Sequence, residues 1–234
     1  MMKSYAILLG GGSGRRMESS VNKVFLPLRG IPAIIRSLAP FTALCVGAVV
    51  VAAEHEIDEM NAVLRRYGMS RFVKAVVPGG SERQYSVWNG LMALPEDAEC
   101  VLIHDGARAL VTEEIIQRAM ASVESHGSGI ASVPVVDTIK RAQKDGLVIE
   151  TPDRSSMYAM QTPQAFRLPL IVEAHKKAQE DGFLGTDDAA LLEHAGMPVY
   201  LSQGDRENLK LTTPTDLRLA EVILTARAEK EAQA

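Results

Sequence analysis

The sequence predicts an α/β fold in which helices cover both faces of a mostly parallel, doubly wound sheet. Short apolar runs alternate with segments of helical spacing along the chain, and this alternation places successive strands parallel to one another. Most of the runs are continuously apolar, as expected for strands covered on both faces. We therefore expect a Rossmann-like sheet with one projecting β-hairpin arm. A single domain over residues 1–234 is expected, because 47% hydrophobic and 23% charged residues suit one large core.

The expected strands and helix starts follow one another in order along the chain. The apolar runs predicted as strands are Tyr5–Leu9, Val46–Ala52, Phe72–Val77, Cys100–His104, Gly129–Val133 and Pro198–Leu201. Between them, Pro32 suits a first helical position, and Ser81 with Gln84 fits a capping box. Threonines followed by acidic residues or by proline predict further helix starts. These threonines are Thr112, Thr186 and Thr213.

One region departs from this alternation of strands and helices. Residues 135–160 alternate polar and apolar side chains, with Asp145-Gly146 at a turn, which is typical of a hairpin. We expect residues 136–160, approximately, to form an arm that projects from the body. Such arms often make dimer contacts, so a homodimer is expected; the alternative is a hairpin that packs on its own subunit.

The bulk properties exclude several classes of protein. The net charge is −4, which argues against a nucleic-acid partner, because such proteins usually present a basic face. No run approaches the roughly 18 apolar residues of a membrane span, and the apolar N-terminal run enters a glycine loop rather than a cleavage site. Cys45 and Cys100 lie in apolar runs without metal-ligand spacing. A cytoplasmic protein is expected.

A glycine-rich loop follows the first predicted strand. Glycine allows backbone N–H groups to approach phosphates where a side chain would collide, and Arg15, Arg16 and Lys23 add cations. The spacing fits neither a Walker A loop nor a dinucleotide fingerprint, which needs a third glycine. The candidate phosphate-binding glycines are Gly10, Gly11, Gly12 and Gly14.

A second glycine turn, Gly79-Gly80, precedes a predicted helix that carries Arg83 in its first turn. A helix N-terminus favours anions, and Gly80, Ser81 and Ser86 offer small polar contacts for the edge of a base. The alternative is a tight turn with no ligand.

A third segment places His104-Asp105 directly after a buried strand. In open α/β sheets, ligands bind at the carboxyl ends of the strands. Asp105 is therefore a candidate ligand for Mg²⁺, which prefers oxygen donors and phosphates. The alternative is that Asp105 only caps a turn.

These motifs carry a resemblance to a known family. The run Gly10 to Met17, followed by Lys23 and the sequence VFLPL, resembles nucleotidyltransferases with a GxGxRM loop. Within that group, the chain is similar to the 2-C-methyl-D-erythritol 4-phosphate cytidylyltransferase family from Ala6 to about Glu221. The shared segments are GGxERxxSV, HDxARP, PVxDTIK, QTPQ and an NLK segment. Gly106 and Ala109 depart from the family's alanine and proline, and both changes could loosen that turn.

The resemblance implies transfer of CMP from CTP to a polyol phosphate, with Mg²⁺ or another divalent cation as cofactor. It implies that Arg16 and Lys23 are catalytic. The implied nucleotide contacts are Gly10, Gly11, Gly12, Gly14, Gly80, Ser81, Arg83, Ser86, Asp105 and Ala107. The implied contacts to the acceptor are Arg108, Thr138, Arg154, Thr162, Asp187 and Lys210, with Thr138 and Arg154 reaching the site of a neighbouring subunit.

Some assignments stay open from the sequence. N-capping explains Asp187 equally well, and either Asp205 or Glu207 could approach the metal. A ribitol 5-phosphate cytidylyltransferase is the nearest rival function. A sugar-nucleotide pyrophosphorylase, an NAD-dependent oxidoreductase and an inactive nucleotide-binding regulator would each share part of the pattern. The missing third glycine argues against the oxidoreductase, and Arg16, Lys23 and Asp105 together argue against the inactive regulator.

Overall fold

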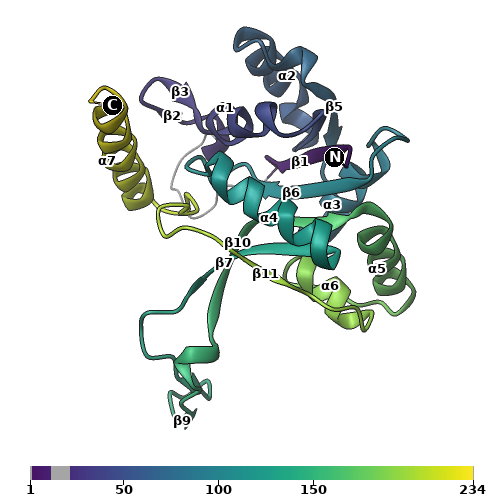
Figure 1. Ribbon diagram of the computed structural model, residues 1–234, viewed down its shortest axis with the longest axis vertical. Helices are drawn as coiled ribbons and strands as arrows, with labels where there is room; N and C mark the ends of the chain where they lie inside the picture. The colour runs from purple at the N-terminus through teal and green to yellow at the C-terminus, as the bar shows by residue number, and fades with distance from the viewer. Residues whose placement is uncertain (1, 12–21, 234) are drawn as a thin grey trace.

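The computed structural model describes residues 2–11 and 22–233, and within these ranges a seven-stranded sheet forms the centre of the molecule (Figure 1). Its strand order is β11-β7-β10-β6-β1-β4-β5. All neighbouring strands are parallel except the two pairs that involve β10. The predicted mostly parallel, Rossmann-like sheet is confirmed. Its strands are β1 (Ser4–Leu9), β4 (Gly47–Ala52), β5 (Val73–Pro78), β6 (Cys100–Asp105), β7 (Ser128–Pro134), β10 (Tyr158–Arg167) and β11 (Leu201–Gln203).

Helices cover both faces of this sheet. Ile7 and Leu8 of β1 are fully buried in two separate apolar clusters, because successive side chains of a strand point to opposite faces. Each such side chain contributes about 1.5–3 kcal/mol by leaving water. The helices in the Leu8 cluster are α1 (Ala33–Leu38), α2 (Ile57–Arg66) and α4 (Glu113–His126). Those in the Ile7 cluster are α3 (Arg83–Met92), α5 (Leu168–Glu180) and α6 (Asp188–His194).

The strand order reverses at β1. This strand pairs with β4 on one side and with β6 on the other, so that Leu9 lies opposite both Val51 and Asp105. A ligand-binding crevice forms at such a switch point, beyond the carboxyl ends of the strands. The fold therefore brings the end of the first strand, where the glycine loop begins, next to Asp105.

Two strand predictions need correction. The last strand begins at Leu201, so Pro198–Leu201 was placed too early. The long strand β10 was not predicted beyond the arm, because its segment QTPQ is polar and contains proline, which weakens a strand pattern. In the structure, the pairing of β10 with β7 is irregular between Met160 and Gln164, and this irregularity accommodates Pro163.

The projecting arm is confirmed as a hairpin. It consists of β8 (Arg141–Ala142) and β9 (Val148–Glu150), which pair antiparallel. Gly146 adopts φ 94° at the turn, and Asp145 accepts a hydrogen bond from Leu147 N–H (3.1 Å). Figure 1 shows the arm extending from the ends of β7 and β10 away from the helices.

The helix starts agree with the predictions in part. Thr213 caps α7 (Pro214–Glu231) in a capping box with Asp216, as its sequence predicts. Thr112 occupies the N-cap of α4, although its side chain makes no capping bond there. Pro32 lies one residue before α1.

Two predicted caps are wrong. Helix α3 starts at Arg83 after Glu82, so Ser81 and Gln84 form no capping box. Gln84 instead bonds with its side chain to Phe183 O and Gly185 N, which ties α3 to the segment before α6. Asp187, not Thr186, caps α6.

Polar and apolar contacts attach helix α7 to the rest of the molecule. Arg29 N–H donates to Glu221 (2.7 Å), and the Arg227 guanidinium donates to Leu110 O (3.0 Å). Ala220 is fully buried in a third apolar cluster with Leu28 and Leu211. These contacts fix the chain that follows Lys210. Among the described residues, no helix has both the length and the apolar character that crossing a bilayer requires.

Candidate active site

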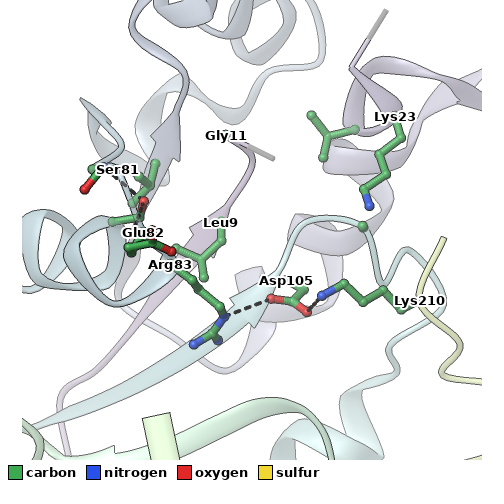
Figure 2. Close-up of a pocket in the computed structure, with 13 residues that line it drawn as sticks. Leu9, Gly11, Lys23, Ser81, Glu82, Arg83, Asp105 and Lys210 are labelled. Atoms are coloured by element: carbon green, nitrogen blue, oxygen red, sulfur yellow. Dashed lines mark hydrogen bonds and ion pairs between the residues drawn. The ribbon is translucent and has the colours of Figure 1, made fainter. Parts of the chain in front are cut away.

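A cavity of about 480 Å³ lies at the switch point, beyond the ends of β1 and β6. It combines glycine turns with three cations and one buried carboxylate (Figure 2). The residues predicted as catalytic, nucleotide-binding or acceptor-binding that line it are Gly11, Lys23, Gly80, Ser81, Arg83, Ser86, Asp105, Ala107 and Lys210. Gly10, also predicted to bind the nucleotide, does not line it. Gly12, Gly14 and Arg16 lie outside the described residues.

Asp105 is the last residue of β6 and lies between two cations. Lys210 Nζ is 2.7 Å from Asp105 Oδ2, and Arg83 Nε is 3.6 Å from Oδ1. Figure 2 shows the two side chains approaching Asp105 from opposite sides. Burial opposes the charged carboxylate, but the Arg83 guanidinium and the Lys210 ammonium hold the pKa of Asp105 well below its usual range. Asp105 is therefore an anion at neutral pH.

The backbone of Asp105 is held by a buried hydrogen-bonded chain. Its N–H donates to Thr162 Oγ1 (3.0 Å), which lies 3.0 Å from His104 Nδ1. His104 Nε2 is 3.2 Å from Arg108 O, and because a carbonyl only accepts, Nε2 carries the proton and Nδ1 accepts from Thr162. Burial lowers the pKa of His104 to about 4. The ring is neutral and orients the turn rather than transferring protons.

Gly106 makes this turn compact. Its N–H donates to Leu9 O (2.9 Å), and an added Cβ would lie 2.7 Å from Ile34 Cδ1 and 3.0 Å from Leu9 O. The expected loosening of the turn is not seen at this residue. Ala109 is buried in the third apolar cluster, with Leu28, Leu211 and Ala220.

The second glycine turn is closed by Ser86. Its hydroxyl accepts Gly80 N–H (3.0 Å) and donates to Glu82 O (3.1 Å). A Cβ on Gly80 would collide with Tyr85 Cβ, so this close approach requires glycine. The turn lies at the wall of the cavity, where Gly80, Ser81 and Ser86 are lining residues.

Lys23 is positioned by its neighbour Asn22. The Asn22 amide donates to Gly10 O (2.7 Å) and to Glu56 (2.8 Å), and its oxygen accepts Val24 N–H (3.3 Å). Lys23 opens the short helix η2 (Lys23–Phe25), and its side chain points into the cavity (Figure 2). At Gly11, a Cβ would lie 3.1 Å from Ala53 N, so the chain passes close to the end of β4.

Five predicted acceptor residues do not line the cavity; one of them, Thr162, holds the backbone of Asp105 instead. Arg108 donates to Asn208 O (2.7 Å), and Asp187 caps α6 while accepting from Gln164 (2.8 Å). Thr138 is exposed beside the arm, and Arg154 donates to Val136 O (2.7 Å) at the base of the arm. The geometry brings the nucleotide residues together and leaves these acceptor residues apart within one chain.

The two acids considered for a metal also lie elsewhere. Asp205 accepts Glu207 N–H (2.8 Å), and Glu207 pairs with Arg227 (2.9 Å). Within residues 2–11 and 22–233, no group of three or more His, Cys, Asp or Glu side chains could hold a metal ion. Among the described residues that line the cavity, Asp105 is the buried carboxylate and Glu82 is an exposed one. One carboxylate plus substrate phosphates is a usual setting for Mg²⁺.

The sequence reasoning gave no role to Asp188 and Gln164. Asp188 Oδ2 accepts from Arg83 Nη2 (2.8 Å). Gln164 Oε1 accepts the N–H groups of Asp188 and Ala189 (3.0 and 3.1 Å). The pair of adjacent acids Asp187-Asp188 was the available sequence signal for a further polar contact, because capping of the helix explains only one of the two.

The fold and this cavity define a nucleotide-binding α/β protein suited to phosphate chemistry, since cations and glycine turns converge at its switch point. The sequence model of the 2-C-methyl-D-erythritol 4-phosphate cytidylyltransferases matches residues 5–226. The chain belongs to this family.

Relatives and solved structures agree over nearly the full length. The chain is 44% identical over 232 residues to the 2-C-methyl-D-erythritol 4-phosphate cytidylyltransferase of Bacillus licheniformis, covering 98% of this chain and 99% of that one. It is 47% identical to the protein of that name from Geobacillus thermodenitrificans, with 97% and 99% covered. The 4-diphosphocytidyl-2C-methyl-D-erythritol synthase structure from Anaerococcus prevotii superposes with a TM-score of 0.83 at 28% identity, covering 96% and 99%.

Proposed function

We propose that this chain binds CTP in the cavity beyond β6 and transfers its CMP there to 2-C-methyl-D-erythritol 4-phosphate. As a family member, the chain is a cytidylyltransferase that forms 4-diphosphocytidyl-2-C-methyl-D-erythritol and pyrophosphate. The observation that carries the site assignment is the position of Asp105 between Arg83 and Lys210 at the switch point of the sheet. CTP and the polyol phosphate are the partners. Since CTP is an intracellular metabolite, we place the reaction in the cytoplasm.

The nucleotide is held by backbone and small side chains. Gly80, Ser81 and Ser86 face the base, and the loop beginning at Gly10 and Gly11 faces the phosphates. Support comes from the lining of the cavity, which includes Gly11, Gly80, Ser81 and Ser86, and from the close backbone approaches at Gly11 and Gly80, which leave little room for a Cβ. Gly12 and Gly14 complete the phosphate loop in this proposal, and Ala107 forms part of the cavity wall.

The reacting nucleophile is an oxygen of the acceptor's phosphate. It forms a new bond to the α-phosphorus of CTP, while the bond from that phosphorus to the bridging oxygen breaks and pyrophosphate leaves with the electron pair. A phosphate monoester has a second pKa of about 6, so it is largely dianionic at pH 7 and needs no general base. The neutral, fully buried His104 is consistent with this. Catalysis then rests on positioning and on neutralising charge.

The cations take distinct roles in this scheme. Lys23 and Arg16 stabilise the charge that accumulates at the α-phosphorus in the transition state. Lys210 leaves Asp105 and receives the acceptor's phosphate, with Arg108 and Thr162 at the edge of the acceptor site. Support comes from the orientation of Lys23 and Lys210 toward one cavity (Figure 2).

We propose Mg²⁺, or another divalent cation, as cofactor. Asp105 would hold it, because a charged carboxylate at the end of β6 faces the space where the triphosphate would lie. When bound, Mg²⁺ supplies neutralisation of the triphosphate charge and helps pyrophosphate to leave. Asp105 would exchange its ion pair with Lys210 for this ligand.

The arm completes the acceptor site of a second subunit in a homodimer. Thr138 and Arg154 lie at the base of the projecting arm rather than in the cavity of their own chain. The arm and its base also carry exposed apolar side chains that a second copy could cover; they are Val136, Leu147, Val148, Ile149, Tyr158 and Met160. Arg154 suits the acceptor phosphate because its planar fork binds phosphate oxygens in pairs. Asp187 would contact the acceptor's hydroxyls. We treat residues 1–234 as one domain with this arm.

The reaction is tested by pyrophosphate release from CTP and Mg²⁺ with two acceptors. We expect turnover with 2-C-methyl-D-erythritol 4-phosphate and little with ribitol 5-phosphate. Turnover only with ribitol 5-phosphate would keep the cavity and the chemistry but reject the acceptor. Release with neither acceptor would reject the proposed function.

A further inference from the structure

Arg83 is shared between two carboxylates, and only one of them lines the cavity. Its Nη2 donates to Asp188 Oδ2 at 2.8 Å, whereas its Nε lies 3.6 Å from Asp105 Oδ1. The Asp188 side chain is 1% exposed and that of Arg83 is 29% exposed. Burial alone would lower the pKa of Arg83, but Asp188 first and Asp105 second raise it above its usual value. The closer and better shielded partner of Arg83 is therefore the acid behind the cavity.

We propose that Asp188 is a positioning residue that holds Arg83 in its nucleotide-binding orientation and keeps it from closing onto Asp105. This inference rests on the proposed binding of CTP in the cavity. With Asp188 in place, Arg83 has a permanent anionic partner, so Asp105 can change its own partner when the triphosphate enters. Without that charge, Asp105 becomes the nearest anion to Arg83 and the two side chains close on each other.

Asp188 is itself fixed to the sheet. It is the first residue of α6, and its N–H donates to Gln164 Oε1 (3.0 Å) while Gln164 Nε2 donates to Asp187 (2.8 Å). Gln164 lies on β10 directly opposite Ile103 of β6, two residues before Asp105. The helix start is thus held in register with the strand that carries Asp105, so the distance between the two carboxylates is set by the backbone.

Among the described residues, the ion-pair partner of Asp188 is Arg83. Its Oδ1 is buried and has no hydrogen-bond partner among residues 2–11 and 22–233. His175, the nearby titratable ring from α5, is neutral because burial lowers its pKa to about 4. Breaking a buried charged pair by removing one partner is costly. The Arg83 guanidinium is therefore held firmly against the Asp188 carboxylate.

The test is calorimetric titration of CTP into wild type, Asp188→Asn, Arg83→Gln and the double variant, with EDTA present and again with Mg²⁺. We expect Asp188→Asn to raise Kd for CTP about tenfold, in line with loss of a charged hydrogen bond. The double variant should bind no more weakly than Arg83→Gln, because Asp188 acts through Arg83. Mg²⁺ should tighten CTP binding less in Asp188→Asn than in wild type, since Arg83 then occupies Asp105.

A merely structural role gives a different pattern. Partial unfolding lowers the binding stoichiometry and the Tm but leaves the Kd of the folded fraction unchanged. Asp188→Glu keeps the charge and should restore most of the affinity. Asp181→Asn is the matched control, because Asp181 is a more exposed acid between α5 and α6 that pairs with Lys177 and His194 rather than with a residue of the cavity.

The outcomes separate the two proposals. Wild-type Kd in Asp188→Asn, or a loss that adds fully to that of Arg83→Gln, overturns the role of Asp188 alone. If the wild-type chain binds no CTP with or without Mg²⁺, both the proposed nucleotide site and the role of Asp188 are rejected.

Discussion

Replacing Thr162 with valine tests how the Asp105 turn is held in place. The Thr162 hydroxyl is buried; it accepts Asp105 N–H and donates to His104 Nδ1, each at 3.0 Å. Valine keeps the shape but leaves both partners buried without a hydrogen bond. An unsatisfied buried group costs about 1–3 kcal/mol, so with two such groups we expect the free energy of unfolding to fall by roughly 2–6 kcal/mol. For a chain of this size, each kcal/mol lowers Tm by about 2–4 °C, so Tm should fall by roughly 4–24 °C.

The assay is urea unfolding followed by circular dichroism, together with kcat for pyrophosphate release. We expect kcat of the folded Thr162→Val variant to fall as well, because the Asp105 backbone loses its partner. Thr162→Ser keeps the hydroxyl and should retain most of the stability. Equal stability of wild type and Thr162→Val, or equal losses in the valine and serine variants, would refute the role given to this hydroxyl.

Three further results are expected. Lys23→Ala should lower kcat by several orders of magnitude in a pyrophosphate assay, and near-normal kcat would remove Lys23 from the transition state. Gly80→Ala should raise KM for CTP and lower Tm, because the added Cβ collides with Tyr85 at the start of α3 and displaces the cavity wall; an unchanged KM would contradict the tight turn. The free energy of unfolding should fall as pH drops from about 6.5 toward 4. In that range His104 and His175 are protonated in the unfolded chain but stay neutral in the folded chain, because burial lowers the pKa of each to about 4. Each histidine should contribute on the order of 3 kcal/mol by pH 4, and His175→Leu should flatten the profile of unfolding free energy against pH.

The parallel core was predictable because it depends on local patterns. Runs such as Val46–Ala52 are apolar throughout, which only a strand covered on both faces requires. The position of Asp105 followed from the same pattern, since a charged residue ends the buried strand. Strand β10 was missed because its segment QTPQ is polar, and these polar side chains are explained only by contacts with other segments. Thr162 bonds to His104, and Gln164 bonds to Asp187 and Asp188.

Besides strand β10, the sequence did not reveal the contacts between segments that are distant along the chain. Capping predicts a polar residue before α6, but which of two adjacent aspartates faces Arg83 depends on where the helix begins. Arg83 and Asp188 are 105 residues apart, and no local pattern joins them. The same holds for Gln84, whose spacing from Ser81 fits a cap although its side chain bonds across to Gly185.

The proposed division of the site between a cavity and a neighbour's arm is tested most directly by mixing two variants that we expect to be inactive, Lys23→Ala and Arg154→Ala. In a symmetric dimer whose arms cross, random reassembly places one intact site in each mixed dimer, so about a quarter of wild-type activity should return. Each variant alone, unfolded and refolded under the same conditions, should stay inactive. Recovery of activity only on mixing would confirm that Lys23 and Arg154 of different chains serve one site, and no recovery from equimolar, fully exchanged dimers would contradict it.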